Sequence, residues 1–387
     1  MSQVSNRKYN VFLSCISVVF FLMSFIKVFT LLSDTNREYL NLANSSFLYL
    51  KMILILFLFM NIMINIHKYQ RGKLVIFFTL ILFFMIFESF IGRYIDFALI
   101  YLIAFSLQDD SKKILRSILY GLTIGIALDI FLVSTGNIAN YIDGLRFGQT
   151  PRYSYGFYGL MIFGRIIRVI AMCHVLIVKK PKYIHMLIII SLALFSYLQT
   201  GTRSEFLTVI IIYIVATLYR FIDLKVLSKY IYIVATALLW ILPLLSIYFG
   251  KFYDKIQFLM YLNQYSTGRF QYSGWLWNTL TPHLFGNRSF KFFNGLHAGD
   301  IGYLYNFVDN GWDQIILIQG IASTVIVLVT IQLLLNTLLK NKLFMDLVLV
   351  LILIVLFTIS QSVLFDIILN PMLIKLGLIF KKEVSNE

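Results

Sequence analysis

The sequence predicts an all-α polytopic integral membrane protein with about twelve transmembrane helices (11–12) and one large extracytoplasmic loop. Hydrophobic residues make up 59% of the 387 residues and charged residues only 13%, whereas a soluble domain carries about 25% charged residues. Apolar runs close to the roughly 20 residues of a membrane span recur along the whole chain. These long uninterrupted runs exclude a transmembrane β-barrel, whose strands alternate in polarity.

The apolar runs set the order of the helices. Predicted spans lie at residues 11–32, 47–66, 74–87, 94–107, 114–133, 156–178, 184–198, 205–221, 230–249, 314–338, 343–360 and 363–380. The third and fourth runs are short and Asn370-Pro371 interrupts the last, so ten or eleven full crossings are the alternative. No repeat or low-complexity linker divides the chain, and we expect a single membrane domain over residues 1–387.

Lysine and arginine are distributed unevenly between the two sides of these spans. With the N-terminus inside, the inner segments hold more than half of the 33 Lys and Arg, and the short outer loops hold isolated cations. Cytoplasmic loops carry an excess of Lys and Arg, so we expect both termini in the cytoplasm. The formal net charge of +15 then reflects membrane topology and does not indicate nucleic-acid binding.

Residues 250–313 form the longest stretch that cannot be a span. It contains three of the four tryptophans, Trp275, Trp277 and Trp312, among many Phe and Tyr. Loops longer than about 12–15 residues are usually functional or disordered, and disordered segments are poor in aromatic residues. We therefore expect an ordered extracytoplasmic cap with short amphipathic helices, one of them following Gly268. Simple anchoring at the membrane interface is the alternative role for the tryptophans.

The first motif is T-G-T-R-S-E-F-L, residues 200–207, on the predicted outer side. Thr202 and Glu205 fit a T-x-x-E capping box, so a helix is expected to begin here with Arg203 in its first turn. Arginine is unfavourable at a helix N-terminus. A binding role would explain it, because free backbone N–H groups and a guanidinium can hold one phosphate. The alternative is an interfacial arginine paired with Glu205.

Further cations lie in and before the sixth predicted span. Arg165 and Arg168 are three residues apart and share a helix face, and charge within a span is a functional pointer. A structural ion pair with Asp129 or Asp96 is the alternative. The outer loop before this span adds two more cations, Arg146 and Arg152.

The cap holds the candidate acid–base groups. His297 and Asp309 could each accept a proton, although an acidic residue before a helix is often only a cap, an interpretation that weighs more for Asp313. Arg269 follows a glycine and is either a binding residue or a solvated loop cation. The sequence contains no P-loop, no D-x-D and no metal-ligand spacing, so we expect neither a metal nor another cofactor.

At these residues the chain resembles the O-antigen ligase/polymerase superfamily, most of all the Wzy-type polysaccharide polymerases. T-G-T-R resembles the family's S/T-x-S/T-R at an outer helix start. Residues 268–287 resemble its G-R-x-x-x-W…P-x-x-G pattern, and residues 309–321 its H/D-N…G motif before a span. The likeness covers roughly residues 146–321. The ligases have histidine where this chain has Asp309, which favours a polymerase.

The resemblance implies a GT-C-like glycosyltransferase of capsule, O-antigen or exopolysaccharide synthesis, acting on the outer face of the bacterial cytoplasmic membrane. The growing glycan would leave its polyprenyl (undecaprenyl) diphosphate carrier for the non-reducing-end hydroxyl of a new lipid-linked repeat unit. No metal or cofactor is implied. The implied partners are lipid-linked repeat units and membrane lipid, with a chain-length regulator and a flippase of the same pathway.

The resemblance also implies roles for the candidate residues. Asp309 or His297 would be the base. The diphosphate-binding residues would be Arg203, Arg269, Arg165, Arg168, Arg152 and Arg146, and the sugar-stacking residues Trp275, Trp277 and Trp312. Three alternatives are an O-antigen-type ligase, a lipid-linked oligosaccharide flippase, and a dolichol-type transferase with an acid in its first outer loop (Asp34 or Glu38). A flippase would need polar residues along a central cavity, whereas here they gather on one side.

Overall fold

The computed structural model describes residues 2–64, 72, 74–75, 77–82, 95–107, 111–140, 142–143, 151–221, 224–265, 268–287, 310–359 and 366–380. The chain divides into two compact units where the sequence suggests one membrane domain. Unit 1 contains Met1–Lys73, Leu102–Asp223 and Ile367–Glu387, and unit 2 contains Leu74–Tyr101 and Leu224–Asp366. Each unit is described by itself.

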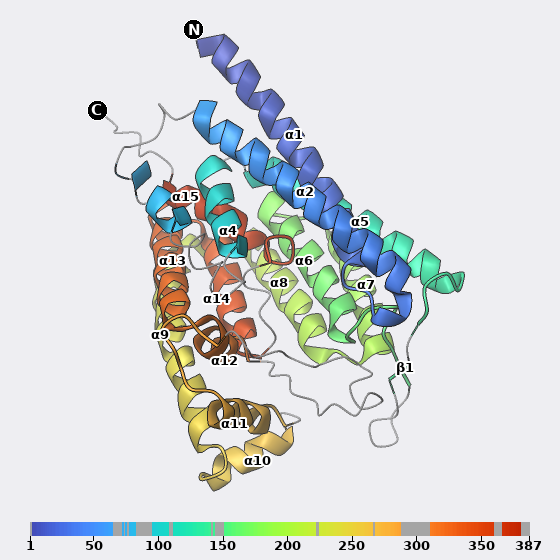
Figure 1. The fold of residues 1–387 in the computed structure, drawn as a ribbon, viewed down its shortest axis with the longest axis vertical. Helices are drawn as coiled ribbons and strands as arrows, with labels where there is room; N and C mark the ends of the chain where they lie inside the picture. The colour runs from blue at the N-terminus through green and yellow to red at the C-terminus, as the bar shows by residue number, and fades with distance from the viewer. Residues whose placement is uncertain are drawn as a thin grey trace. The chain divides into compact units, whose positions relative to one another are not determined.

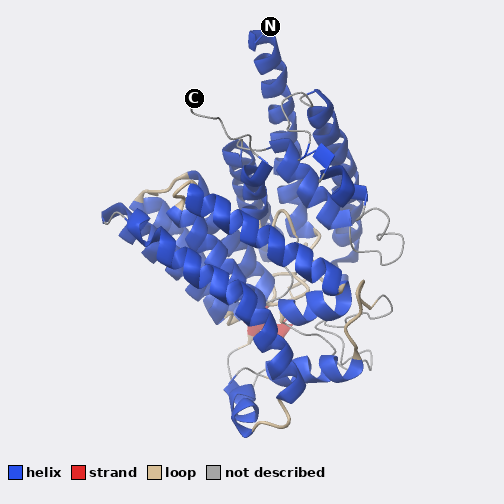
Figure 2. Ribbon diagram, turned by 90° about the vertical axis from the view of Figure 1, so that its left-hand side faces the viewer, coloured by secondary structure: helices blue, strands red, loops and turns tan. Residues whose placement is uncertain are grey.

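Helices dominate the described chain, which confirms the predicted all-α class (Figure 2). Among the described residues, seven helices are long and apolar enough to cross a membrane, and three shorter apolar helices accompany them. The chain is therefore a multi-pass membrane protein. The number of twelve spans stays a prediction, since the third expected span, 74–87, is described only at residues 74–75 and 77–82.

Unit 1 is built mainly of helices that lie lengthwise along one another, as α1 and α2 do in Figure 1. Its elements are α1 (Ser2–Phe29), η1 (Asp34–Asn36), α2 (Arg37–Ile64), α5 (Ser111–Ser134), β1 (Ile142–Asp143), β2 (Arg152–Tyr153), α6 (Met161–Ile177), α7 (Tyr183–Thr200), α8 (Arg203–Phe221), η6 (Pro371–Leu376) and α15 (Gly377–Phe380). Helix α4 (Ile95–Leu107) begins in unit 2 and ends in unit 1.

Helix α5 packs against α1 through two glycines. A Cβ on Gly121 would lie 2.5 Å from the carbonyl oxygen of Phe21, and one on Gly125 would lie 2.8 Å from Val28. The spacing is the G-x-x-x-G pattern that lets membrane helices approach closely. Because lipid offers no hydrophobic drive for helix pairing, this close backbone packing is what associates α1 with α5.

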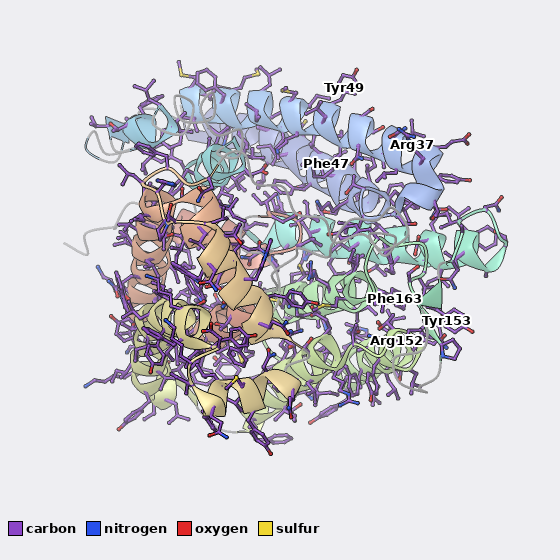
Figure 3. The ribbon with its side chains drawn as sticks, turned by 60° about the horizontal axis from the view of Figure 1, so that its bottom comes forward. Arg37, Phe47, Tyr49, Arg152, Tyr153 and Phe163 are labelled. Carbon is purple, nitrogen blue, oxygen red and sulfur yellow. The ribbon has the colours of Figure 1, made fainter. Side chains whose placement is uncertain are left out.

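Helix α6 is the central helix of unit 1. Every side chain from Ile162 to Leu176 is buried, and the helix packs against α5, α7 and α8. A short antiparallel hairpin lies before it, with Asp143 opposite Arg152 in the register of β1 and β2. Figure 3 shows Arg152 and Tyr153 of this hairpin and Phe163 of α6.

Unit 2 is organised around α9. Its elements are η3 (Leu224–Leu227), α9 (Ser228–Phe252), α10 (Gln257–Tyr265), α11 (Arg269–Thr279), α12 (Gly311–Gln314), the π-helical turn η4 (Ile315–Gln319), α13 (Ile321–Lys340) and α14 (Phe344–Ile359). Helix α9 packs against α11, α13 and α14. Within the predicted cap, α11 begins directly after Gly268, where the aromatic spacing predicts a helix.

The tenth predicted span, 314–338, is not one continuous helix. Gly320 breaks it with a φ of 96°, between η4 and α13. Gly286 of the predicted cap, with a φ of 85°, packs directly against this break. A Cβ on Gly286 would lie 2.0 Å from the carbonyl oxygen of Ile318, and one on Gly320 would lie 2.4 Å from the amide nitrogen of Gly286.

Backbone hydrogen bonds join the two segments at this glycine contact. The amide of Ile321 donates to the carbonyl of His283 at 3.1 Å, and the amide of Asn287 donates to the carbonyl of Ile318, also at 3.1 Å. The break in the helix leaves the amide of Ile321 and the carbonyl of Ile318 without partners within the helix, and residues of the segment 283–287 form hydrogen bonds with both. Gly286, at the end of the segment that begins with Pro282, and Gly320 of the following motif are thus in contact.

Gly286→Ala is expected to destabilise the protein strongly. The added methyl group meets backbone atoms that cannot rotate away, and overpacking of this kind costs about 1–3 kcal/mol or more. Gly136→Ala is the matched control, because Gly136 also has a positive φ (76°) but open space around it. Thermal unfolding in detergent measures both. Equal losses in the two variants would show that only the left-handed backbone matters.

The expected orientation can be tested at exposed positions on either side. Gln271 of α11, Lys113 of α5 and Val226 of η3 are exposed. With both termini in the cytoplasm, a cysteine at Gln271 reacts with an impermeant thiol reagent in intact cells. Cysteines at Lys113 or Val226 react only after lysis. The reverse pattern would overturn the predicted orientation.

Candidate functional site

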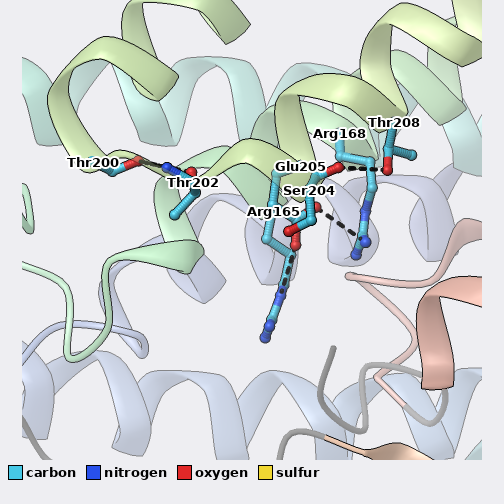
Figure 4. A network of polar contacts seen from close by, with 7 residues as sticks. All are labelled: Arg165, Arg168, Thr200, Thr202, Ser204, Glu205 and Thr208. Carbon is cyan, nitrogen blue, oxygen red and sulfur yellow. Dashed lines mark hydrogen bonds and ion pairs between the residues drawn. The ribbon is translucent and has the colours of Figure 1, made fainter. Parts of the chain in front are cut away.

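Two arginines of α6 share one carboxylate of α8 inside unit 1 (Figure 4). The Arg165 Nε lies 3.8 Å from Glu205 Oε1, and the Arg168 Nη1 lies 3.1 Å from Glu205 Oε2. All three side chains are buried, at most 5% exposed. The two arginines are thus ion-paired, but the expected partners Asp129 and Asp96 were wrong, because the carboxylate belongs to Glu205.

The local sequence explains how α8 comes so close to α6. A Cβ on Gly164 would lie 3.0 Å from the Glu205 Cβ and 3.1 Å from the Thr202 hydroxyl, so the glycine lets the start of α8 approach α6 closely. Glu205 lies in the first turn of α8, where the helix dipole favours an ionised carboxylate. The dipole and the two guanidinium groups thus stabilise the same negative charge.

The predicted capping box does not form. Helix α8 begins at Arg203 as predicted, but the Glu205 carboxylate faces α6 and has no hydrogen-bond partner among the described residues. The Thr202 hydroxyl pairs with that of Thr200 at 2.7 Å. A T-x-x-E pattern describes local geometry only, and here the attraction to two buried cations outweighs a local hydrogen bond.

The cluster of Arg165, Arg168 and Glu205 contains more positive than negative charge. Its two cations face one anion, and no second carboxylate pairs with either arginine within the part of the chain that the structure describes. The Nε groups of both arginines also lack hydrogen-bond acceptors there. A buried charge without full compensation is costly, so this cluster maintains a positive potential beneath the first turn of α8.

Arg203 lies at the surface, two residues before Glu205 in the same first turn of α8. Its side chain is exposed and has no hydrogen-bond or ion-pair partner among the described residues. No described side chain accepts a hydrogen bond from the amides of Ser204 or Glu205 either. The start of α8 therefore presents uncapped N–H groups and a guanidinium, a combination that suits an anion.

Arg152 holds the turn between α7 and α8 in place. Its Nε donates to the carbonyl oxygen of Thr200, the last residue of α7, at 2.6 Å. Gly201 continues the turn with a φ of 69°, and a Cβ there would lie 2.7 Å from the same Nε. A cation at a helix C-terminus is favourable for the helix dipole. Arg152 thus supports the turn from which Arg203 projects.

The cap residues of unit 2 differ in how far they reach the surface. Arg269 is half-buried and is the first residue of α11, while Trp275 is 38% exposed. Trp312 is fully buried, and its indole N–H donates to the Thr358 hydroxyl at 3.2 Å. Trp277 is 8% exposed. A covered ring offers no face to a sugar, so of the three predicted stacking residues we retain Trp275 alone.

Sequence reasoning treated Asp313 as a helix cap, but it is the centre of a buried hydrogen-bond network. Its carboxylate accepts from the Ser246 hydroxyl at 2.6 Å, from the Trp277 indole N–H at 2.9 Å and from the Ser273 hydroxyl. Burial raises the pKa of Asp313 to about 6, although the three hydrogen bonds act in the opposite direction. The signal available in the sequence was an acidic residue beside a tryptophan.

Three predicted site residues, Arg146, His297 and Asp309, lie outside the described residues. Within the described part of the chain no group of three or more His, Cys, Asp or Glu side chains could hold a metal ion. Comparisons of the chain with protein-family models, with curated proteins and with solved structures gave no match.

The unequal charge of the α6–α8 cluster predicts an asymmetry between two substitutions. Glu205→Gln leaves two neighbouring buried cations without an anion, and breaking a buried ion pair in this way costs about 3–5 kcal/mol. Arg165→Gln leaves the Arg168–Glu205 pair intact and should cost markedly less. Thermal unfolding of the purified variants in detergent compares them. A larger loss for Arg165→Gln would contradict the inferred excess of positive charge.

Proposed function

We propose that the protein is a metal-independent polysaccharide polymerase. It moves a growing glycan from a polyprenyl diphosphate carrier to the non-reducing-end hydroxyl of a lipid-linked repeat unit, on the outer face of the bacterial cytoplasmic membrane. The observation that supports this most is the start of α8, where exposed Arg203 and uncapped amides lie above a buried cationic pair. The sequence resemblance to Wzy-type polymerases supports the choice of reaction.

The diphosphate is both the recognition element and the leaving group of this reaction. As the glycosidic oxygen–carbon bond to the diphosphate breaks, negative charge develops on the departing phosphate oxygen. Preplaced cations stabilise that charge more than they stabilise the neutral bond, which lowers the barrier. In this proposal Arg203 touches the phosphate, because its exposed guanidinium is planar and can donate two parallel hydrogen bonds.

Arg165 and Arg168 are given a supporting role in this proposal. They are covered by protein and so do not touch the substrate in this conformation. Their ion pairs with Glu205 and their net positive charge stabilise the first turn of α8. Arg152 does the same for the preceding turn through Thr200. In unit 2, Arg269 is proposed as a further phosphate-binding residue.

The acceptor hydroxyl must lose a proton as it attacks the anomeric carbon. Asp309 is the proposed base and His297 the alternative, since the resemblance favours the first and the ordinary pKa of histidine, about 6.5, favours the second. Asp309→Asn removes basicity with little change of shape. Turnover of this variant, compared with that of His297→Gln, assigns the base to the residue whose loss is greater.

The proposed function is tested by reconstitution. Purified protein incubated with lipid-linked repeat units, without added metal or nucleotide, is expected to produce a ladder of polymer. Arg203→Ala should lower the rate by about 10²–10³ while the protein stays folded, because one charge-stabilising donor contributes that much in comparable sites. Arg203→Lys should also be impaired, since a lysine lacks the planar fork.

Arg116→Ala is the matched control, because Arg116 is an exposed arginine near the start of α5 in the same unit, on the side expected to be cytoplasmic, and should be dispensable. A wild-type protein that makes no polymer would refute the proposed function. An Arg203→Ala variant as active as the wild type would refute the phosphate site.

A further inference from the structure

Helices α9 and α11 meet closely at two glycines of unit 2. A Cβ on Gly250 of α9 would lie 2.2 Å from the Trp277 ring, and one on Gly274 of α11 would lie 2.5 Å from the Tyr253 ring. The absence of side chains at these two positions brings Ser273 and Trp277 down onto α9. Both side chains thereby contact the Asp313 carboxylate. Larger side chains at the two glycines would hold the helices too far apart for these contacts.

Every hydrogen bond in the network around Asp313 is donated toward its carboxylate. Asn310 Nδ2 donates to the Ser246 hydroxyl, which in turn donates to Asp313, while Ser273 and Trp277 donate from α11. Asp313 is fully buried, and each of its carboxylate oxygens accepts at least one bond. The Asp313 carboxylate therefore joins α9, α11 and α12 through hydrogen bonds. No cation among the described residues pairs with this carboxylate.

The face of α11 that meets Asp313 also includes its first residue. Arg269, Ser273 and Trp277 follow one another at intervals of four residues, and residues so spaced lie on one side of a helix. The bonds from Ser273 and Trp277 consequently fix the rotation of α11 about its axis as well as its distance from α9. Any loss of these bonds would turn or lift the end that begins with Arg269.

A second connection runs through Asn310. Its Oδ1 accepts from the amide of Trp312 at 3.0 Å and begins α12, and its Nδ2 binds Ser246. Asn310 directly follows Asp309 in the sequence, so the network also anchors the chain at the point where the proposed base is attached.

We infer that Asp313 is a positioning residue, whose carboxylate holds α11 against the C-terminal end of α9 and so places Arg269. The role of Arg269 rests on the proposed function, whereas the fixing of α11 does not. Asp313 is not a catalytic residue in this conformation, because its oxygens are covered and engaged. It acts through the residues whose backbone it holds.

The fixing of α11 is measured by a distance within unit 2. Spin labels are attached to cysteines that replace Gln271 on α11 and Ile233 on α9, both of which are exposed. Ile233 lies roughly 25 Å along α9 from Gly250, at 1.5 Å per residue. Cys15→Ser removes the partly exposed native thiol, while Cys173 is fully buried. We expect a narrow distance distribution that broadens in Asp313→Asn.

Ser273→Ala is the milder second variant, because it keeps the charge and removes a single hydrogen bond, and it should broaden the distribution in the same direction. Ser323→Ala is the matched control, since Ser323 is a buried serine of the same unit whose hydroxyl donates to the carbonyl of Gln319, four residues earlier, and not to Asp313. An unchanged distribution in both Asp313→Asn and Ser273→Ala would overturn the inference, whatever the activity.

The link to Arg269 is measured by non-additivity. Asp313→Asn should lower polymerisation by about 10²-fold, the loss that a displacement of about 1 Å can cause. In an Arg269→Ala background, Asp313→Asn should lower the rate of polymerisation by less than about twofold further, because the arginine that Asp313 places is already absent. General damage to the fold would instead lower activity again in that background, and this result would overturn the assignment. A wild-type protein without polymerase activity refutes the proposed function, while the spin-label distances still decide the fixing of α11.

Discussion

The constraint on which unit 1 depends is the cost of burying charge inside a helix bundle. Arg165 and Arg168 lie in the most buried helix of the unit, where an uncompensated charge costs several kcal/mol. That cost is reduced by one carboxylate, which must come from another helix and must stay ionised. Glu205 meets both conditions, because Gly164 allows α8 to approach and the dipole of α8 favours the charge.

Unit 2 also contains a buried ionisable group, but there the group is acidic. Its buried charge is negative, and Asp313 is stabilised by three hydrogen-bond donors where Glu205 is stabilised by guanidinium groups. Hydrogen bonds from neutral donors are directional, so they fix orientations more closely than an ion pair does. The glycine contact between 283–287 and the broken helix adds a second directional connection, made of backbone atoms alone.

Features that depend on local periodicity could be predicted from the sequence. The apolar runs predict the helices, and the T-x-x-E pattern of Thr202 and Glu205 predicts a helix start at Arg203, where α8 begins although the capping box itself does not form. Features that depend on a distant partner could not be predicted. Nothing near Glu205 in the sequence indicates two arginines 37 and 40 residues earlier, and nothing near Gly320 indicates Gly286.

The shared carboxylate has a consequence for how the protein is made. A helix with two arginines enters the bilayer poorly on its own, because each costs about 2.5–3.5 kcal/mol on scales measured with the insertion machinery. The residue that offsets this cost, Glu205, follows α6 and α7 in the chain and is therefore synthesised after both helices. We therefore expect α6 to insert stably only together with α8, so that a released chain truncated before Glu205 would insert α6 poorly.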